Sequence, residues 1–303
     1  MTINTKWFYI FIFFVQPCYA IENLSMLYDT AELEYWKTRY LPNMTGVWSE
    51  DLYRYLTDEE KSIHDEIGFH FALPQDQDKH GDQFSVAYSC DPGSITYPPL
   101  NVKLIDDLSI ATAFLQKSGD FEQLNEYIRK IKSLKTTSNS EKLNLSPLPA
   151  MGIPEDIYEQ DEYVDDVSQK LLKTAVVWLM AHNLGHIYLG HCDNSGAEYA
   201  NKQYVEIAAD RFATEIMRRM GVPPIGLSVY FNFVAQYREN PHSGPHPISS
   251  LRLRFLAEHI LDNKSRFLVI DTDELDLEVM LNGLADALVN VADSLEHMED
   301  KRK

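Results

Sequence analysis

Apolar residues recur at helical spacing through most of the second half of the chain. Positions three and four residues apart are apolar over 167–190, 201–220, 225–238 and 249–261, and again from residue 275 to the C-terminus. This periodicity is typical of helices that bury one face. A run of four apolar residues at 267–270 interrupts it and indicates an extended segment. The second half is therefore predicted to be a set of packed helices.

The first half combines two short extended segments with helices. Residues 84–89 and the stretch around Ile95 and Tyr97 flank the turn-forming sequence Asp-Pro-Gly, which predicts a hairpin or an edge strand. Helical spacing follows in two stretches, 102–116 and 121–134. Taken with the second half, these patterns predict an α+β fold that is mostly helical and has a small sheet.

The connection between the two halves has a different composition. Residues 136–165 are rich in Ser, Asn and Pro and, toward the end, in Asp and Glu. Such a stretch is predicted to be an exposed acidic linker loop, either a solvated connection or a gate over a neighbouring site. It separates an N-terminal region of helices and β-edge, residues 21–135, from a helical region, residues 166–303.

The first twenty residues have the layout of a secretory signal peptide. Lys6 precedes the apolar run 7–15, and a Pro-containing segment then ends in the small residue Ala20. Cleavage after Ala20 is expected, which predicts a secreted or periplasmic protein. The alternative is an uncleaved anchor, although the run is shorter than the roughly 20 residues of a membrane helix. No other stretch is predicted to span a membrane.

Charge and cysteine content narrow the class of partner. The chain has 46 acidic against 27 basic residues and a net charge of −19 at pH 7, so nucleic acid and anionic membrane surfaces are not expected partners. Cys18 leaves with the signal peptide. The two remaining cysteines, Cys90 and Cys192, are predicted to form a disulfide in an oxidising compartment; two unpaired buried thiols are the alternative.

Two histidines interrupt the most apolar of the predicted helices. His182 and His186 are four residues apart, so both imidazoles lie on one helical face and can reach one metal ion. They share the stripe of Ala175 and Leu179 and are therefore expected to point inward. The H-x-x-x-H spacing is a weak signal by itself.

Two carboxylates follow twenty residues later. Glu206 and Asp210 flank the apolar stripe of the next predicted helix. At this spacing they repel each other, and burial adds a desolvation cost. Their placement favours a pair in which one carboxylate binds a cation and the other a histidine. Two acids on a wetted helix edge are the alternative.

These motifs together resemble the metal site of gluzincin zinc metallopeptidases of the M48 family. That family has H-E-x-x-H followed by E-x-x-A-D, and this chain has His182-Asn-Leu-Gly-His186 followed by Glu206-Ile-Ala-Ala-Asp210. A third block, PHPISSLR at 245–252, looks like the H-P-x-x-x-x-R stretch of M48 peptidases. The resemblance covers residues 167–257. Phage-exclusion peptidases of the Lit type share a similar core, but a secretory signal does not suit their cytoplasmic setting.

The resemblance implies a zincin-like fold and one Zn²⁺ ion per chain, which makes residues 166–303 a zinc-binding, metallopeptidase-like region. It carries the three zinc ligands over to His182, His186 and Glu206. It gives Asp210 the role of the acceptor that orients a ligand histidine.

The third block supplies two more expected site residues. The resemblance places His246 near the open coordination position, where it would stabilise oxyanion charge, while a turn histidine between two prolines is the alternative. Arg252 would hold local structure or pair with an acid. Metzincins have a third histidine ligand at the position of Cys192, so a thiolate ligand there is a further, weaker alternative.

Asn183 stands where the family pattern has glutamate. That glutamate takes a proton from the metal-bound water and passes it to the leaving amine, and an amide cannot do this. Loss of a general base typically costs about 10² to 10⁴ in rate.

Three hypotheses follow from this substitution. The leading one is a pseudo-peptidase that keeps zinc and holds a polypeptide, with the sheet at 84–97 as the substrate-side edge. The alternative is an active zinc-dependent endopeptidase with a substitute base such as Asp193 or Glu198. A purely structural helical protein with an empty site is the third.

The predicted disulfide can be tested directly. Mass spectrometry of a non-reduced digest of the mature protein is expected to find a peptide pair that joins Cys90 to Cys192. This link would close a loop of about 100 residues and stabilise the fold by up to about 4.7 kcal/mol in the chain-entropy treatment. Two free thiols in the digest would contradict the prediction.

Overall fold

The computed structural model describes residues 24, 27–73, 84–134, 145–191, 199–238, 240–242, 244, 246–267 and 274–300. Its elements before the long central helix are α1 (Thr30–Gly46), a π-helical segment (Val47–Leu52), α2 (Asp58–His64), β1 (Gly68–Phe71), β2 (Ala87–Cys90), β3 (Gly93–Tyr97), α3 (Pro99–Gln116), α4 (Glu122–Leu134), α5 (Pro147–Ala150) and α6 (Ile157–Gln160). From there the elements are α7 (Glu162–Tyr188), α8 (Tyr199–Met220), α9 (Leu227–Tyr237), α10 (Ser250–Asp262), a short 3-10 helix (Lys264–Arg266) and α11 (Glu274–Asp300).

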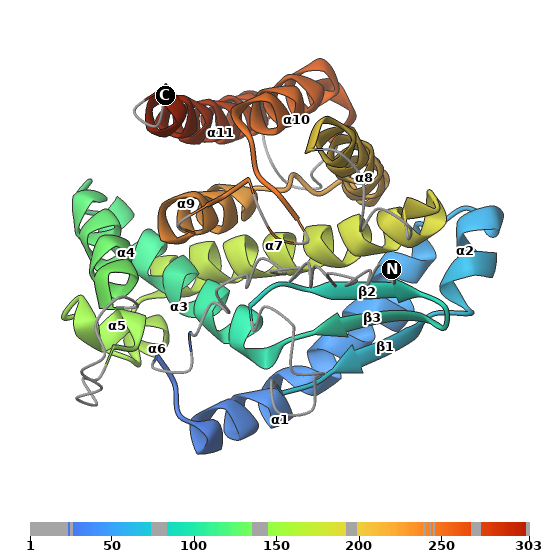
Figure 1. Ribbon diagram of the computed structural model, residues 1–303. Helices are drawn as coiled ribbons and strands as arrows, with labels where there is room; N and C mark the ends of the chain where they lie inside the picture. The colour runs from blue at the N-terminus through green and yellow to red at the C-terminus, as the bar shows by residue number, and fades with distance from the viewer. Residues whose placement is uncertain are drawn as a thin grey trace, which may run out of the picture.

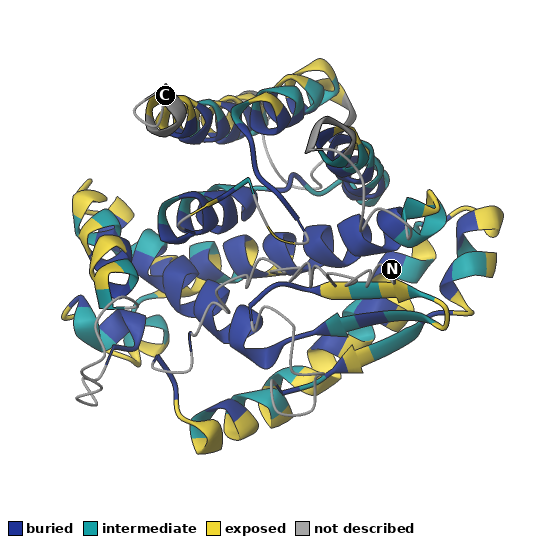
Figure 2. Cartoon of the chain, viewed as in Figure 1, coloured by how far each residue is buried: buried dark blue, intermediate teal, exposed yellow. Residues whose placement is uncertain are grey.

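Helix α7 is the centre of this fold. Figure 1 shows it between α3 and the sheet on one side and α8 and α9 on the other, with α10 and α11 outermost. Residues 174–186 of α7 are all buried, and Figure 2 shows this stretch in dark blue. A helix that is apolar nearly all round needs partners on every side, and here the sheet and the helices provide them.

The small sheet lies beside α7. Its order is β1-β3-β2, with β1 parallel and β2 antiparallel to β3, and Tyr88 pairs with Ile95. The predicted hairpin is therefore present, and the prediction of a mostly helical α+β fold with a small sheet is confirmed. Strand β1 was not predicted, because four residues are too few to show a clear alternation.

Residues 145–165 are not the exposed linker loop that was predicted for 136–165. Residues 135–144 lie outside the described part, but Leu145, Leu148 and Ile153 are buried and α5 packs against α3. The hydroxyl of Tyr127 on α4 donates to the Leu145 carbonyl at 2.8 Å. The prolines and acids of this segment concealed its few apolar anchors, and α7 begins at 162 because Asp161 caps its first turn.

Several other predictions fall on residues that are not described. These are the signal peptide at 1–20, the extended segment beyond Phe267, and Cys192, the predicted partner of Cys90. They stay predictions. Within the described ranges, no helix has both the length and the apolar character needed to cross a membrane.

Helix α1 is attached to α3 through a buried polar cluster. Tyr40 of α1 donates to Asp106, and Tyr28 donates to Asp107 at 2.7 Å. Lys103 pairs with Asp107 at 2.7 Å and lies 4.1 Å from the centre of the Trp36 ring. Burial, with the neighbouring charge of Asp107, raises the pKa of Asp106 from 3.8 to about 6. Lys103 thus neutralises one of two adjacent buried carboxylates.

The two carboxylates are expected to respond oppositely to neutralisation. A raised folded-state pKa means that the contribution of Asp106 to stability is present below its unfolded pKa and is lost as pH rises through about 6. At neutral pH, Asp106→Asn should therefore raise the free energy of unfolding by up to about 3 kcal/mol, and the gain should vanish near pH 4. Denaturant unfolding across this pH range measures both variant and parent.

Asp107→Asn is the matched control for this experiment. Burial raises the pKa of Asp107 as well, but this substitution leaves buried Lys103 without the carboxylate that neutralises it, so it should destabilise the fold by about 3 kcal/mol. Equal effects of the two substitutions would contradict the assignment of the lysine to Asp107.

Candidate metal centre

The packing of α7 on α8 brings the two motif helices together. A Cβ at Gly185 would lie 2.9 Å from Cδ1 of Phe212, so the two helices can approach this closely only with glycine at that position. Gly185 directly precedes His186, and Phe212 is two residues beyond Asp210. The contact therefore sets the histidine pair of α7 against the carboxylate pair of α8.

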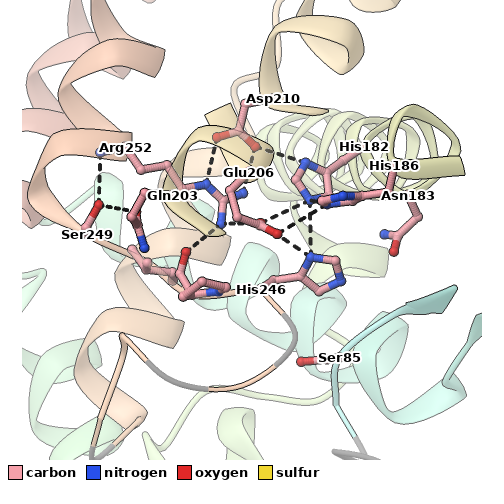
Figure 3. A network of polar contacts seen from close by, with 12 residues as sticks. Ser85, His182, Asn183, His186, Gln203, Glu206, Asp210, His246, Ser249 and Arg252 are labelled. Atoms are coloured by element: carbon pink, nitrogen blue, oxygen red, sulfur yellow. Dashed lines mark hydrogen bonds and ion pairs between the residues drawn. The ribbon is translucent and has the colours of Figure 1, made fainter. Parts of the chain in front are cut away.

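Four buried side chains point ligand atoms at a common centre. They are His182 and His186 of α7, Glu206 of α8, and His246 from the segment before α10, and their ligand atoms all lie within 4.8 Å of one another. Figure 3 shows them converging. His182 Nε2 lies 3.0 Å from His186 Nε2 and 3.4 Å from Glu206 Oε2, and His186 Nε2 lies 3.3 Å from Glu206 Oε1.

Polar contacts behind the α7 histidines turn their Nε2 atoms toward this centre. His182 Nδ1 lies 2.9 Å from Asp210 Oδ1, and His186 Nδ1 lies 3.2 Å from His191 Nδ1. With the protons assigned to these Nδ1 atoms, both Nε2 lone pairs face each other. Two lone pairs at 3.0 Å repel unless a proton or a metal ion lies between them. The donor set therefore fits a metal ion.

Arg252 balances the two carboxylates of α8. Its Nε and Nη2 donate to Asp210 at 2.7 and 2.6 Å, and its Nη1 lies 2.7 Å from Glu206 Oε2. Burial would raise the pKa of both carboxyls, but the guanidinium and the histidines outweigh it and lower both. Glu206 is thus held in the ionised form in which a carboxylate binds a metal ion.

The α7 histidines differ in their protonation. Burial lowers the pKa of His186 to about 3, so its imidazole is neutral and able to bind a metal. Burial also opposes the charged form of His182, but its contacts with Asp210 and Glu206 outweigh this and raise its pKa. A metal ion at the centre would compete with that proton.

Asn183 lies beside the cluster without joining it. Its Nδ2 donates to the Leu179 carbonyl of its own helix at 2.8 Å, and its Oδ1 accepts no hydrogen bond from the described residues. Figure 3 draws no contact between its amide and the other labelled side chains. The residue offers no group that titrates near neutral pH.

Two aromatic side chains near the cluster, those of Tyr88 and His191, were not predicted as site residues. The Tyr88 ring of β2 stacks on His186 with centroids 4.6 Å apart and planes 6° apart, and its hydroxyl donates to the His191 carbonyl at 3.3 Å. Burial, followed by the charge of Glu206, raises the pKa of Tyr88 to about 12. No sequence motif marks either residue, because β2 and the end of α7 meet only in the folded chain.

The structure brings together the three ligands that the resemblance implies and their predicted supports. His182, His186, Glu206, Asp210, Arg252 and His246 all belong to one buried network. The proposed substitute bases, Asp193 and Glu198, and the alternative ligand, Cys192, lie outside the described residues.

Comparison with known proteins finds a match to a family model. The family model described as Peptidase U49 matches residues 101–261, which is more than half of the chain and runs from α3 into α10. The matched span contains all four residues of the ligand cluster. No curated protein and no solved structure matches the chain.

The ligand cluster predicts one bound divalent metal ion per chain. Glu206→Gln keeps the size of the side chain but removes its charge, so metal affinity should fall at least about tenfold. Elemental analysis and competition with a chelating indicator measure content and affinity.

Glu215→Gln is the matched control on the same helix, because Glu215 pairs with Arg218 away from the cluster. It should leave metal content unchanged. Equal metal binding by Glu206→Gln and the parent would show that Glu206 is not a ligand.

Proposed function

The chain belongs to the Peptidase U49 family, and from this membership and the ligand cluster we propose a zinc-binding peptidase homologue that holds a polypeptide but hydrolyses it poorly. The observation that carries the proposal is Asn183, which stands between two metal-binding histidines where a peptidase of this type needs a carboxylate. The N-terminal sequence supports secretion as part of the proposal.

Zinc is the ion that this donor set suits best. Imidazole nitrogens with one carboxylate oxygen, in a buried four-atom cluster, are typical zinc ligands. The order His182, His186, Glu206 supports a gluzincin-type centre like that of M48 peptidases, although the matched family is U49. Bound zinc polarises a peptide carbonyl and makes a coordinated water more acidic.

The remaining chemistry depends on side chains of the chain itself. Asp210 holds the His182 ring with Nε2 toward the centre, and Arg252 keeps Glu206 ionised. Asn183 cannot take a proton from water or return one to a leaving amine. These side chains hold the centre in place, but position 183 offers no group for the two proton transfers of peptide hydrolysis.

Strand β2 is the edge proposed to hold the polypeptide. It is an edge strand of the sheet and contacts α7, and the ring of its Tyr88 stacks on His186. An extended segment that added to such an edge would run past the metal centre and gain main-chain hydrogen bonds without dependence on its sequence. This geometry supports a polypeptide partner.

Restoring the carboxylate tests the proposal. Asn183→Glu should produce metal-dependent cleavage of a pool of denatured proteins at least about 10²-fold above the parent. Asn183→Gln, which adds the same methylene but keeps the amide, is the matched control and should stay at the parent's level. Gel electrophoresis of the cleavage fragments, with and without chelator, measures cleavage.

Binding by the parent is measured in the same series. The parent should bind a labelled, unfolded polypeptide in fluorescence anisotropy without cutting it. Chelator-sensitive turnover by the parent at the rate of Asn183→Glu would overturn the assignment of an impaired peptidase.

A further inference from the structure

His246 lies where a fourth ligand would stand. Its Nδ1 is 3.3 Å from His182 Nε2 and 3.4 Å from Glu206 Oε2. Metal–nitrogen and metal–oxygen bonds of about 2.0–2.2 Å place tetrahedral ligand atoms about 3.3–3.5 Å apart. The two distances from His246 Nδ1 therefore fit a tetrahedral shell. They fit it as closely as the distances among the ligand atoms of His182, His186 and Glu206 do.

The second ring nitrogen of His246 fixes which atom faces the centre. Nε2 lies 3.1 Å from the Val86 carbonyl, which can only accept, so Nε2 carries the proton. With the proton on Nε2, Nδ1 is the ring atom whose lone pair can face the centre. A stabiliser of oxyanion charge would have to present an N–H there instead.

The backbone around His246 is held on both sides. Buried Arg238 donates to the His246 carbonyl at 3.0 Å and to Ser85 Oγ at 2.7 Å, and Arg252 donates to the Pro247 carbonyl at 3.0 Å. Ser85 adjoins Val86, so the segment with His246 and the segment leading into β2 are joined through both the ring and the main chain. These contacts fix the position of the His246 ring.

We propose that His246 is the fourth metal ligand and closes the coordination sphere in the resting protein. This inference rests on the proposed metal centre and deepens it. Zinc with four protein ligands is typical of structural sites, whereas catalytic sites keep one position open. Water or a peptide carbonyl reaches the ion only when His246 leaves. A closed coordination sphere limits hydrolysis by keeping substrate away from the ion, and this effect is independent of Asn183.

Cobalt substitution tests closure without an activity assay. The Co²⁺-loaded parent should show the intense visible absorption of a tetrahedral ion, and azide should leave the spectrum unchanged because no position is open. Co²⁺-loaded His246→Ala should bind azide with a spectral shift. His242→Ala, which removes a hydrogen bond to the Ile248 carbonyl in the same segment but no ligand, should behave as the parent does.

The result for the parent alone can overturn the inference, so the test does not depend on the folding of a variant. A Co²⁺ spectrum of the parent that azide shifts would show an open position and overturn the inference. Failure to load one equivalent of Zn²⁺ or Co²⁺ would instead overturn the proposed function, so the two failures are distinguishable.

A double variant separates the two roles considered for His246. If His246 closes the site, Asn183→Glu with His246→Ala should cleave denatured protein faster than Asn183→Glu alone. If His246 stabilises oxyanion charge, the double variant should be slower, and closure would be wrong. Metal content of both proteins is measured first, so that loss of the ion is not mistaken for loss of a catalytic group.

Discussion

The buried guanidinium of Arg252 is the interaction on which the rest of the centre depends. It sits between Glu206 and Asp210 and also donates to the Pro247 carbonyl. Two carboxylates on adjacent turns of a buried helix would otherwise repel each other and carry a large desolvation cost. With Arg252 present, both remain ionised, so one can hold a histidine and the other can face a cation.

This pairing also joins parts of the chain that are distant in sequence. Arg252 is on α10, its acids are on α8, and the histidine that Asp210 orients is on α7. A divalent ion would add a further link between α7, α8 and the segment that contains His246. The centre therefore links the helices α7, α8 and α10 to one another.

The family match and the site do not share the same boundaries. The match begins at residue 101, after the sheet, yet Val86 and Tyr88 contact His246 and His186. The edge that lies against the metal centre is thus contributed by a part of the chain that the family model does not cover.

The sequence by itself determined the helices of the second half, the spacing of the histidines on α7 and of the carboxylates on α8, and the position of Asn183 between the two histidines. These depend on spacing within one or two helices, where 3.6-residue geometry fixes which side chains share a face. It did not determine the buried segment after residue 145 or the strand β1, because their few apolar residues gain meaning only from their partners. Only the tertiary structure decided that Nδ1 of His246 faces the ligand cluster and that Tyr88 stacks on His186. Their contacts join segments roughly 60 to 160 residues apart, and no local periodicity encodes a contact over that separation.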